Sequence, residues 1–567
     1  MKSLSKIFSI NAGHDASVVY MEDGNVSWMI EEERYSHKKH DEKAYFCISN
    51  ANNRIDQESV VLLTMLHHPD TLDKSKHVED VTNVLCCKAL KKSTIGYKNC
   101  SDEHHLQHAA TGFYNSGFDE AVCVVVDGAG AFVDDCGHEV ESIYTASYPD
   151  QFHLVSQKAV PWYSKVDSHT LKNPTSGIGF IYSAISEYLG FGMLGSGTVM
   201  GLAPYGEEDP EVKPFIVNGE IDESLFERNG TGVRFKPYDP FPMQCPIFDS
   251  VRDPRARHQK LCNLAYRLQK DFEIYMVGVI KRAIELTGCK NVVLSGGCAL
   301  NCVGNYEYLK HLPEGSKLFV EPICYDAGTS LGLAMLEWRM ASKSMEKKPL
   351  EHLYLGPPQR HYVPDGAYDV SLSDVVDVID RGEPVAIFQG RSEQGPRALG
   401  NRSLLFDPRV ENAREIMNDI KGRELFRPFA ASVMKEHADV FFDMRGLEES
   451  PFMMYAMDAY EEHWDTIPGV LHIDKTCRIQ TVTREQNQNY YDLIDAFYER
   501  TGIPMLLNTS LNLSGDTICE TVDDAIATLK RSKINYLYLP EFGKMVHIPE
   551  NSNANRRGKI YYGLYRV

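Results

Sequence analysis

The sequence has a deficit of positive charge and no long apolar run. Lys and Arg number 59 against 79 Asp and Glu, so the formal net charge is -20. The electric field of this net charge repels a phosphate polymer unless Lys and Arg are strongly localised, which disfavours a DNA-coating role. No segment approaches the roughly 18 to 20 apolar residues of a membrane helix, and the first residues hold too short an apolar run for a signal peptide. We therefore expect a cytoplasmic protein without a membrane segment.

The CxxC motif is also missing. The 14 cysteines are scattered and include no CxxC motif, which in a long chain indicates reduced thiols and no disulfide framework. Cys298 and Cys302 lie one helical turn apart, but two thiolates do not complete a tetrahedral zinc site. A cysteine metal centre is therefore disfavoured.

The length and composition indicate several folded units. The chain has 567 residues, of which 43% are hydrophobic and 24% charged, and domains usually span roughly 100 to 200 residues. This predicts about three or four domains or subdomains. After Trp338 the sequence turns polar and Pro-rich, and a boundary around 341–360 separates a predicted domain at 1–345 from a second at 356–567.

Strands and helices alternate in the first half. Residues 5–33 predict a three-stranded meander with an Asp-Gly hairpin turn, and buried strands follow at 121–126 and 291–294. Residues 258–287 carry apolar side chains at a 3.6-residue period and stop at Gly288, which predicts one long helix. The alternation is typical of an α/β fold.

Three of these strands end in Gly-rich turns: SINAGHDAS, VVVDGAGAF and VVLSGGCALN. Their order matches the two phosphate loops and the adenosine loop of the actin-like ATPase fold, in which glycine lets main-chain N–H groups approach phosphates. Taken singly, each is more typical of an ordinary turn. Together they predict a nucleotide site with these members: Gly128, Gly296, Gly297, Asn301 and, from CYDAGTSLG, Gly328.

Two histidines and two aspartates form a candidate metal site. His104 and His108 are four residues apart in a predicted helix and so share one face. A helix with solvated histidines is the simpler interpretation of that spacing alone. Asp127, at a strand end, and Asp326 would complete a ligand set that suits Fe(II), Mn(II) or Zn(II).

Over nearly its whole length the sequence resembles the nodulation and antibiotic-tailoring O-carbamoyltransferases, the NodU/CmcH family. The shared blocks span nearly the whole chain and include HHLQHAATGFYNSGFDEAVCVVVDG, MGLAPYG, GPRALGNRS, KGRELFRPFAASV and NTSLN. The resemblance implies an α/β protein with an actin-like (duplicated ribonuclease H-like) N-terminal lobe and a YrdC-like C-terminal lobe. It implies an ATP-dependent O-carbamoyltransferase.

The resemblance also implies two separate half-reactions. The C-terminal lobe would form carbamoyladenylate from carbamoyl phosphate and ATP with Mg(II), whose ligands the sequence does not identify. Two anions need planar cations and many hydrogen-bond donors. Because Gly395, Gly400 and Pro428 interrupt the basic run, we expect its residues on loops. The predicted carbamoyl phosphate and ATP residues are Arg391, Arg397, Arg402, Lys421, Arg423, Arg427, Arg478, Ser510 and Asn512.

Carbamoyl transfer would then take place in the N-terminal lobe, at a metal that the family resemblance makes Fe(II) or another divalent ion. His14 is the candidate base for the acceptor hydroxyl, since a histidine pKa lies near neutrality. The alternative is a loop histidine that is merely hydrogen-bonded to Asp15.

The acceptor is the least constrained part of the prediction. Family members usually carry Glu-Gly-Lys before MGLAPYG, where this chain has Ser196-Gly197-Thr198, and Lys475-Thr476-Cys477 replaces the usual Gly-Thr-Ala. The acidic composition favours a small-molecule acceptor, such as a sugar or antibiotic hydroxyl, over a hydroxymethyl pyrimidine in a nucleotide or DNA. A homodimer is left open.

Two other classes of function also use parts of these motifs. A small-molecule kinase on the actin-like fold explains the first 340 residues but leaves the second lobe without a role, and it would release ADP. A non-enzymatic scaffold would leave the metal residues and the arginine cluster without a role, and loss of nucleotide and metal binding would favour it.

Overall fold

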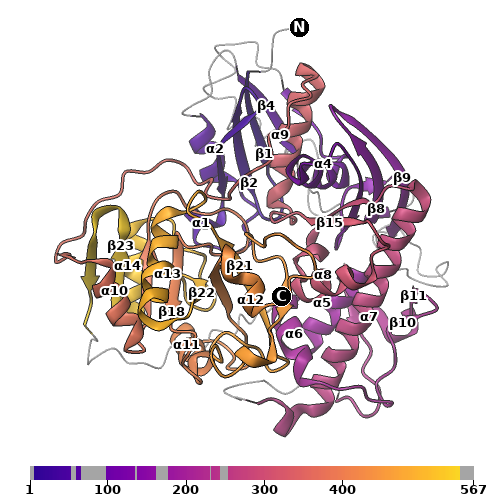
Figure 1. Ribbon diagram of the computed structural model, residues 1–567. Coiled ribbons are helices and arrows are strands. Elements are labelled where there is room, and N and C mark those ends of the chain that lie inside the picture. Colours follow the sequence, from indigo (N-terminus) through magenta and orange to yellow (C-terminus); the bar gives the residue numbers. More distant parts are fainter. Residues whose placement is uncertain are drawn as a thin grey trace.

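The computed structural model describes residues 5–52, 59–64, 97–133, 137–160, 177–229, 232–242 and 253–549. Figure 1 shows an N-terminal lobe, from indigo to rose, beside an orange-to-yellow C-terminal lobe. No helix in the described ranges is both long enough and apolar enough to cross a membrane.

The first sheet of the N-terminal lobe has the strand order β3-β2-β1-β4-β5. β1 and β2 pair antiparallel, as do β2 and β3, whereas β4 and β5 continue parallel to β1. The strands are β1 (Lys6–Asn11), β2 (Ser17–Glu22), β3 (Asn25–Glu31), β4 (Ser59–Thr64) and β5 (Tyr97–Asn99). The predicted meander is confirmed.

The second sheet repeats this arrangement. A hairpin, β8 and β9, lies antiparallel to β6, and β14 and β15 continue parallel to β6 on its other side. A short β7 pairs with the start of β8. The strands are β6 (Glu120–Val126), β7 (Phe132–Val133), β8 (Gly137–Ser147), β9 (Gln151–Val160), β14 (Asn291–Ser295) and β15 (Lys317–Val320). Two sheets with one topology confirm the predicted duplicated, actin-like lobe.

Helices α4 (His104–Ser116) and α9 (Ala327–Ser342) lie between the two sheets. Their apolar residues, such as Phe113 and Leu331, share one core with Ile7 of β1 and Val125 of β6. Both helices are small-residue rich, and Thr111 Oγ1 donates to the Gly328 carbonyl at 2.8 Å. This packing brings the start of α4 close to the start of α9.

The outer face of the second sheet is covered by α7 (Arg255–Thr287), the predicted long helix. It ends at Gly288, whose φ of 70° places it in the left-handed region, as predicted. Its first turn is kinked at His258. In the described part of this lobe the other α-helices are α1 (Glu33–Ser36), α2 (Tyr45–Asn52), α5 (Ile178–Tyr188), α6 (Ser196–Leu202) and α8 (Cys302–Tyr308). Two small hairpins pair β10 (Ile216–Val217) with β11 (Glu220–Ile221), and β12 (Phe226–Asn229) with β13 (Gly232–Phe235).

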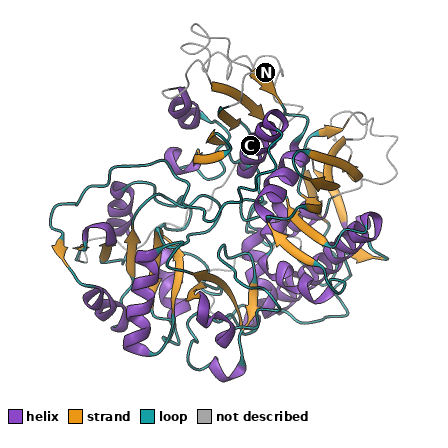
Figure 2. Cartoon of the chain, turned by 45° about the horizontal axis from the view of Figure 1, so that its top comes forward, coloured by secondary structure: helices purple, strands orange, loops and turns teal. Residues whose placement is uncertain are grey.

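The C-terminal lobe is built on a mixed sheet of order β16-β24-β23-β17-β18-β22-β19-β21-β20. Its strands are β16 (Tyr368–Asp369), β17 (Val385–Phe388), β18 (Arg402–Phe406), β19 (Ala430–Met434), β20 (Ala456–Asp458), β21 (Thr476–Val482), β22 (Met505–Ser510), β23 (Tyr536–Leu539) and β24 (Lys544–His547). Its helices are α10 (Leu372–Asp380), α11 (Ala413–Lys421), α12 (Ala438–Phe441), α13 (Gln488–Thr501) and α14 (Val522–Arg531). In Figure 2 purple helices flank the orange strands of this lobe, which is of the predicted α/β class.

Candidate functional site

The four predicted metal ligands meet where β6 ends and where α4 and α9 begin. The two imidazole Nε2 atoms of His104 and His108 lie 3.1 Å apart. Asp127 Oδ2 lies 3.5 Å from the first and 3.3 Å from the second, and Asp326 Oδ1 lies 3.6 and 3.7 Å from them. All four ligand atoms lie within 4.8 Å of one another. The fold therefore brings together the four metal ligands predicted from the sequence.

The donor atoms fit a divalent cation. Asp127 Oδ2 is buried without a hydrogen-bond partner, while Oδ1 accepts from the main-chain N–H groups of Gly128 at 2.6 Å and Gly297 at 3.3 Å. Two buried imidazole nitrogens face each other and both carboxylates. Two imidazoles with two hard oxygens suit Fe(II), Mn(II) or Zn(II).

The pKa values of the cluster residues also favour a bound cation. Burial lowers the pKa of His104, but the Asp326 and Asp127 carboxylates outweigh it and raise the pKa to about 10. Burial raises the pKa of Asp127, but the adjacent His104 and His108 rings outweigh burial and hold this pKa well below the usual range. Burial also raises the pKa of Asp326, and the charge of His104 outweighs it and lowers that pKa. Both carboxylates therefore stay ionised, as metal ligands must.

His14 lies on the first loop beside the same cluster. Its Nδ1 is 3.0 Å from Asp15 Oδ2 and 4.0 Å from Asp326 Oδ2. Asn11, at the end of β1, ties this loop to α9, since its Nδ2 donates to the main-chain oxygens of His14 at 2.9 Å and Asp326 at 3.2 Å. Sequence reasoning did not single out Asn11.

The pKa of His14 lies above the near-neutral value of an ordinary histidine. Burial lowers this pKa, but the hydrogen bond and charge of Asp15, with the charge of Asp326, outweigh burial and raise it to about 9. The physical reason is that two carboxylates face one ring. Neutralising either carboxylate lowers this pKa.

The predicted adenylate residues fall into two groups. Gly128 borders open space, since a Cβ there would meet no heavy atom within 4 Å. Gly296 has a φ of 87°, and a Cβ there would lie 2.4 Å from the Val126 oxygen, so this turn needs glycine to approach β6. A Cβ on Gly297 would lie 2.9 Å from Asp127 Oδ1. These glycines therefore lie beside the end of β6 and Asp127, one of the predicted metal ligands.

Asn301 and Gly328 have evident packing roles. Asn301 Oδ1 caps α8 by accepting from Gly304 N at 2.9 Å, and its amide pairs with Gln269. A Cβ on Gly328 would lie 1.9 Å from the Ile323 oxygen, so α9 needs glycine here to pack. Both positions are explained by the fold alone.

In the C-terminal lobe Lys421, Ser510 and Asn512 form one hydrogen-bonded group. Lys421 Nζ donates to the Ser510 carbonyl at 2.6 Å and to Asn512 Oδ1 at 2.9 Å, and the Ser510 hydroxyl donates to Asn512 Oδ1 at 2.7 Å. Lys421 ends helix α11, so the expectation that the basic run lies on loops is wrong at this residue. Burial, then the charges of Arg423 and Lys39, hold the pKa of Lys421 well below its usual value.

Four arginines extend this cationic cluster. Burial and the Arg427 charge lower the pKa of Arg423 to about 9, and burial and the Arg478 charge lower that of Arg397 to about 10. Arg427 pairs with Glu424 at 2.6 Å. Within the described residues, no carboxylate forms an ion pair with Lys421, Arg423, Arg397 or Arg478. Buried cations that repel one another indicate that an anion belongs among them.

Arg391 and Arg402 are committed to main-chain carbonyls. Arg402 is fully buried at the first residue of β18, again not on a loop, and donates to the oxygens of Gln389, Asn401, Gly390 and Glu520. Its guanidinium also lies 3.7 Å from the Phe388 ring centroid. Arg391 donates to Gly356, Leu355 and, in the other lobe, Ser27. Arg402 therefore ties together loops of its own lobe, and Arg391 also ties the two lobes to each other. A basic motif alone does not reveal these roles.

Two further residues, Lys39 and His40, lie in the segment EEERYSHKKHD, residues 31–41, and were not predicted from the sequence. Desolvation and the charges of Arg427 and Arg423 lower the pKa of Lys39, so this exposed N-terminal residue lies near the cations of the C-terminal lobe. His40 Nδ1 lies 2.7 Å from Asp15 Oδ1. A charged loop that joins two lobes gives no periodic signal from which these roles could be found.

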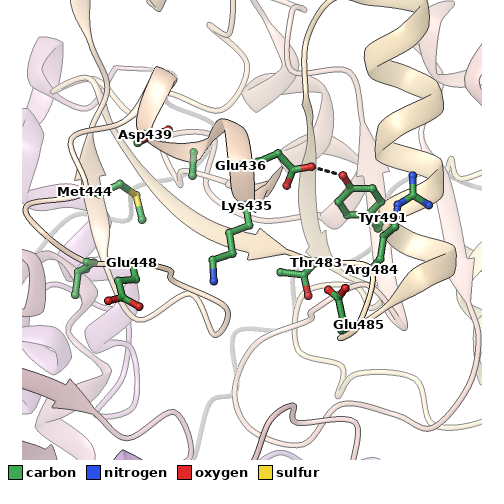
Figure 3. A pocket seen from close by; sticks show the side chains of 11 residues that line it. Lys435, Glu436, Asp439, Met444, Glu448, Thr483, Arg484, Glu485 and Tyr491 are labelled. Atoms are coloured by element: carbon green, nitrogen blue, oxygen red, sulfur yellow. Dashed lines mark hydrogen bonds between the residues drawn. The ribbon is translucent and has the colours of Figure 1, made fainter.

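A separate pocket of about 540 Å³ opens beyond the ends of β19 and β21 (Figure 3). Its two cations, Lys435 and Arg484, pair with Glu449 and Asp492, and Glu436 accepts from the Tyr491 hydroxyl, as the dashed line shows. None of the predicted site residues lines it. With its cations neutralised, it does not suit a phosphate, and the cationic cluster is the better anion site.

Helix α6 begins at Ser196-Gly197-Thr198, which differs from the Glu-Gly-Lys usual in the family that the sequence resembles. Ser196, Gly197 and Thr198 form its first turn, and a Cβ on Gly201 would lie 3.1 Å from Pro428 Cδ. α6 therefore packs next to Arg427 at the junction of the lobes.

Comparison with known proteins identifies the family. The chain matches the carbamoyltransferase N-terminus over residues 52–335 and the carbamoyltransferase C-terminus over residues 376–544. The chain therefore belongs to the carbamoyltransferase family and is a carbamoyltransferase.

Two relatives and one solved structure illustrate the likeness. Nodulation protein NolNO of Sinorhizobium fredii is 29% identical, over 93% of this chain and 78% of its own. Nodulation protein NolO of Bradyrhizobium diazoefficiens is 30% identical, over 77% of this chain and 78% of its own. Full-length HypF, solved in a phosphate- and nucleotide-bound form, shares 15% identity over 60% of this chain and 56% of its own, with a TM-score of 0.37.

Proposed function

We propose that this carbamoyltransferase uses ATP and carbamoyl phosphate to carbamoylate a hydroxyl group, in two half-reactions at two sites. The observation that carries the proposal is the presence of two unlike clusters in one chain. One gathers buried cations in the C-terminal lobe, and the other gathers two imidazoles and two carboxylates in the N-terminal lobe.

The first half-reaction belongs to the cationic cluster. Carbamoyl phosphate and water give carbamate and inorganic phosphate, and the carbamate oxygen displaces pyrophosphate from the α-phosphorus of ATP to give carbamoyladenylate. Lys421, Arg423, Arg427 and Arg478 would neutralise the phosphates. Ser510 would donate its hydroxyl to a phosphate oxygen, turning from Asn512 Oδ1. Mg(II) would accompany ATP.

The second half-reaction belongs to the N-terminal lobe. The acceptor oxygen attacks the carbamoyl carbon, AMP leaves, and the hydroxyl proton passes to His14. His104, His108, Asp127 and Asp326 would hold Fe(II) or another divalent cation, whose chemistry is Lewis-acid polarisation of a carbonyl oxygen. Neutralisation of Asp326 on cation binding removes one of the charges that raise the pKa of His14, and so favours the neutral ring that a base requires.

The glycine turns would admit the adenylate beside this cluster. The open space at Gly128 leaves room for a phosphate next to main-chain N–H groups. The acceptor we propose is a small-molecule hydroxyl, because the formal charge of -20 opposes binding of a nucleic acid. A cytoplasmic location is part of the proposal.

The test is to incubate the protein with ATP, carbamoyl phosphate and a panel of hydroxyl compounds, and to follow the carbamoyl mass gain together with AMP and pyrophosphate. Sugars, aminoglycosides and polyketides form one arm, and hydroxymethyl pyrimidine nucleotides and DNA form the other. Carbamoylation of a sugar, aminoglycoside or polyketide supports the proposal. Carbamoylation of the pyrimidine nucleotides or DNA alone would mean that the proposed class of acceptor is wrong. Release of ADP without carbamoyl transfer would contradict the adenylate route.

A further inference from the structure

Asp15 joins two histidine side chains through its two carboxylate oxygens. Oδ2 lies 3.0 Å from Nδ1 of His14, and Oδ1 lies 2.7 Å from Nδ1 of His40. The two imidazole rings are stacked, with centroids 5.2 Å apart and planes inclined by 16°. Both rings therefore turn the same edge to one carboxylate, which leaves the Nε2 edge of His14 on the side away from Asp15.

Asp15 and His40 both have main-chain conformations in the left-handed region. The φ angles are 53° at Asp15 and 55° at His40, a conformation that is uncommon at non-glycine residues. His40 is held in place by its main-chain N–H, which donates to Glu33 Oε2 at 3.1 Å. Residues in such conformations cluster at active sites.

Asp15 is also fixed by its surroundings. It is nearly buried, whereas His14 and His40 are about one-third exposed. Its carbonyl accepts from Asn11 Nδ2 at 3.3 Å, so the loop is tied to the end of β1. Because Asp15 Oδ1 contacts His40 Nδ1 at 2.7 Å, the Asp15 carboxylate cannot rotate away from His14 without breaking this contact.

We propose that His40 is a positioning residue for carbamoyl transfer, acting through Asp15 on His14. This inference rests on the proposed role of His14 as the base. His40 Nδ1–H holds Asp15, Asp15 holds the proton of His14 on Nδ1, and the lone pair of His14 Nε2 is left for the acceptor hydroxyl. When that proton arrives on Nε2, the Asp15 carboxylate stabilises the imidazolium. No bond to His40 forms or breaks.

The decisive variants are His40→Ala, His40→Asn and His37→Ala. The Asn amide nitrogen lies near the position of His Nδ1 and can still donate to Asp15, so it restores the bond that Ala removes. His37 is the matched control, because it lies in the same loop with a φ of 56°, but its Nε2 faces Asp524 at 3.6 Å. Each is assayed with preformed carbamoyladenylate and methanol, the simplest alcohol, by formation of methyl carbamate.

We expect His40→Ala to lower kcat about 10- to 100-fold with little change in KM for the alcohol, since a misplaced group costs roughly that much. His40→Asn should recover most of this loss, and His37→Ala should match the wild type. ATP-dependent pyrophosphate release should be unchanged in all three. In a His14→Asn background, His40→Ala should cause no further loss, because a positioning residue has nothing left to position.

A readout that needs no acceptor accompanies these assays. ¹⁵N spectra of histidine-labelled, zinc-loaded protein, taken where the His14 ring is neutral, should show His14 protonated on Nδ1 in the wild type and in His40→Asn. In His40→Ala the two tautomers should mix. A single Nδ1-protonated tautomer in His40→Ala, or full methyl carbamate formation by it, would overturn the inference.

Two outcomes separate this inference from the proposed function. If His14→Asn transfers the carbamoyl group normally, the base assignment itself fails. If His14→Asn is inactive and His40→Ala is fully active, only the positioning role fails. Loss of one of two bound metal equivalents in His40→Ala would make His14, Asp15 and His40 a second metal site and would overturn the positioning role.

Discussion

Arg34 of the N-terminal lobe donates from Nη2 to the main-chain oxygen of Gly395 in the C-terminal lobe at 2.9 Å. The Gly395 N–H in turn donates to Glu31 Oε1 at 2.6 Å, and both acidic and basic partners are buried. These bonds fix the junction between the C-terminal lobe, which holds the cationic cluster, and the N-terminal lobe, which holds the metal-ligand cluster. The arrangement suits an enzyme that passes a labile intermediate between two fixed sites.

The metal cluster gives the first prediction. His108→Ala removes one of two imidazoles from a buried set that includes two carboxylates. Metal content should fall toward zero and carbamoyl transfer should be lost, while pyrophosphate release from ATP continues. Elemental analysis of anaerobically purified protein checks the metal. A metal content near zero in active wild-type protein would contradict the assignment.

Arg423 and Arg402 give a matched prediction, since both were predicted as ligands from the same basic run. Arg423→Met should lower adenylate formation about 10- to 150-fold with a modest change in stability, because charge-assisted bonds to phosphate are worth roughly 1.5 to 3 kcal/mol. Arg402→Met should cost about 3 kcal/mol of folding free energy, since buried carbonyls lose their donor. Denaturant unfolding and pyrophosphate release measure the two effects. Equal stability of the two variants would refute the structural role of Arg402.

Gly297 and Gly128 form a second matched pair. A methyl group on Gly297 would lie 2.9 Å from Asp127 Oδ1 and displace this carboxylate, so Gly297→Ala should lower metal content. Gly128→Ala meets no atom within 4 Å, so the metal content and the unfolding midpoint should be unchanged. If the adenylate occupies that space, Gly128→Ala should raise the KM for carbamoyladenylate. Unchanged metal content in Gly297→Ala would contradict the packing argument.

His472 predicts a pH dependence of stability. Its buried Nε2–H donates to the Gly201 oxygen of the other lobe at 2.8 Å, and burial lowers its pKa below the usual value of about 6.5. Below pH 6.5 the unfolded chain therefore binds a proton that the folded chain does not, and stability falls as the pH falls. His472→Gln keeps a donor that does not titrate. Its unfolding midpoint should fall less between pH 7.5 and 5.5 than that of the wild type, and equal slopes would count against this role.

Local patterns predicted much of this molecule. The meander, the helix that ends at Gly288 and the HxxxH pair on α4 each follow from short-range periodicity, and the strand ends placed Asp127. Whether a guanidinium meets a ligand or a carbonyl depends on residues far along the chain, so Arg402 and Arg423 look alike in sequence. The same holds for Lys39 and His40, whose partners lie across the lobe junction and on another loop.

The most direct test of the account is to supply preformed carbamoyladenylate to Arg423→Met and His14→Asn together with an acceptor from the panel. Two sites predict that Arg423→Met, deficient with ATP and carbamoyl phosphate, recovers carbamoyl transfer. His14→Asn should form adenylate normally and transfer none of it, whether the adenylate is made or supplied. Rescue of neither variant, or loss of adenylate formation in His14→Asn as severe as in Arg423→Met, would contradict two separate sites.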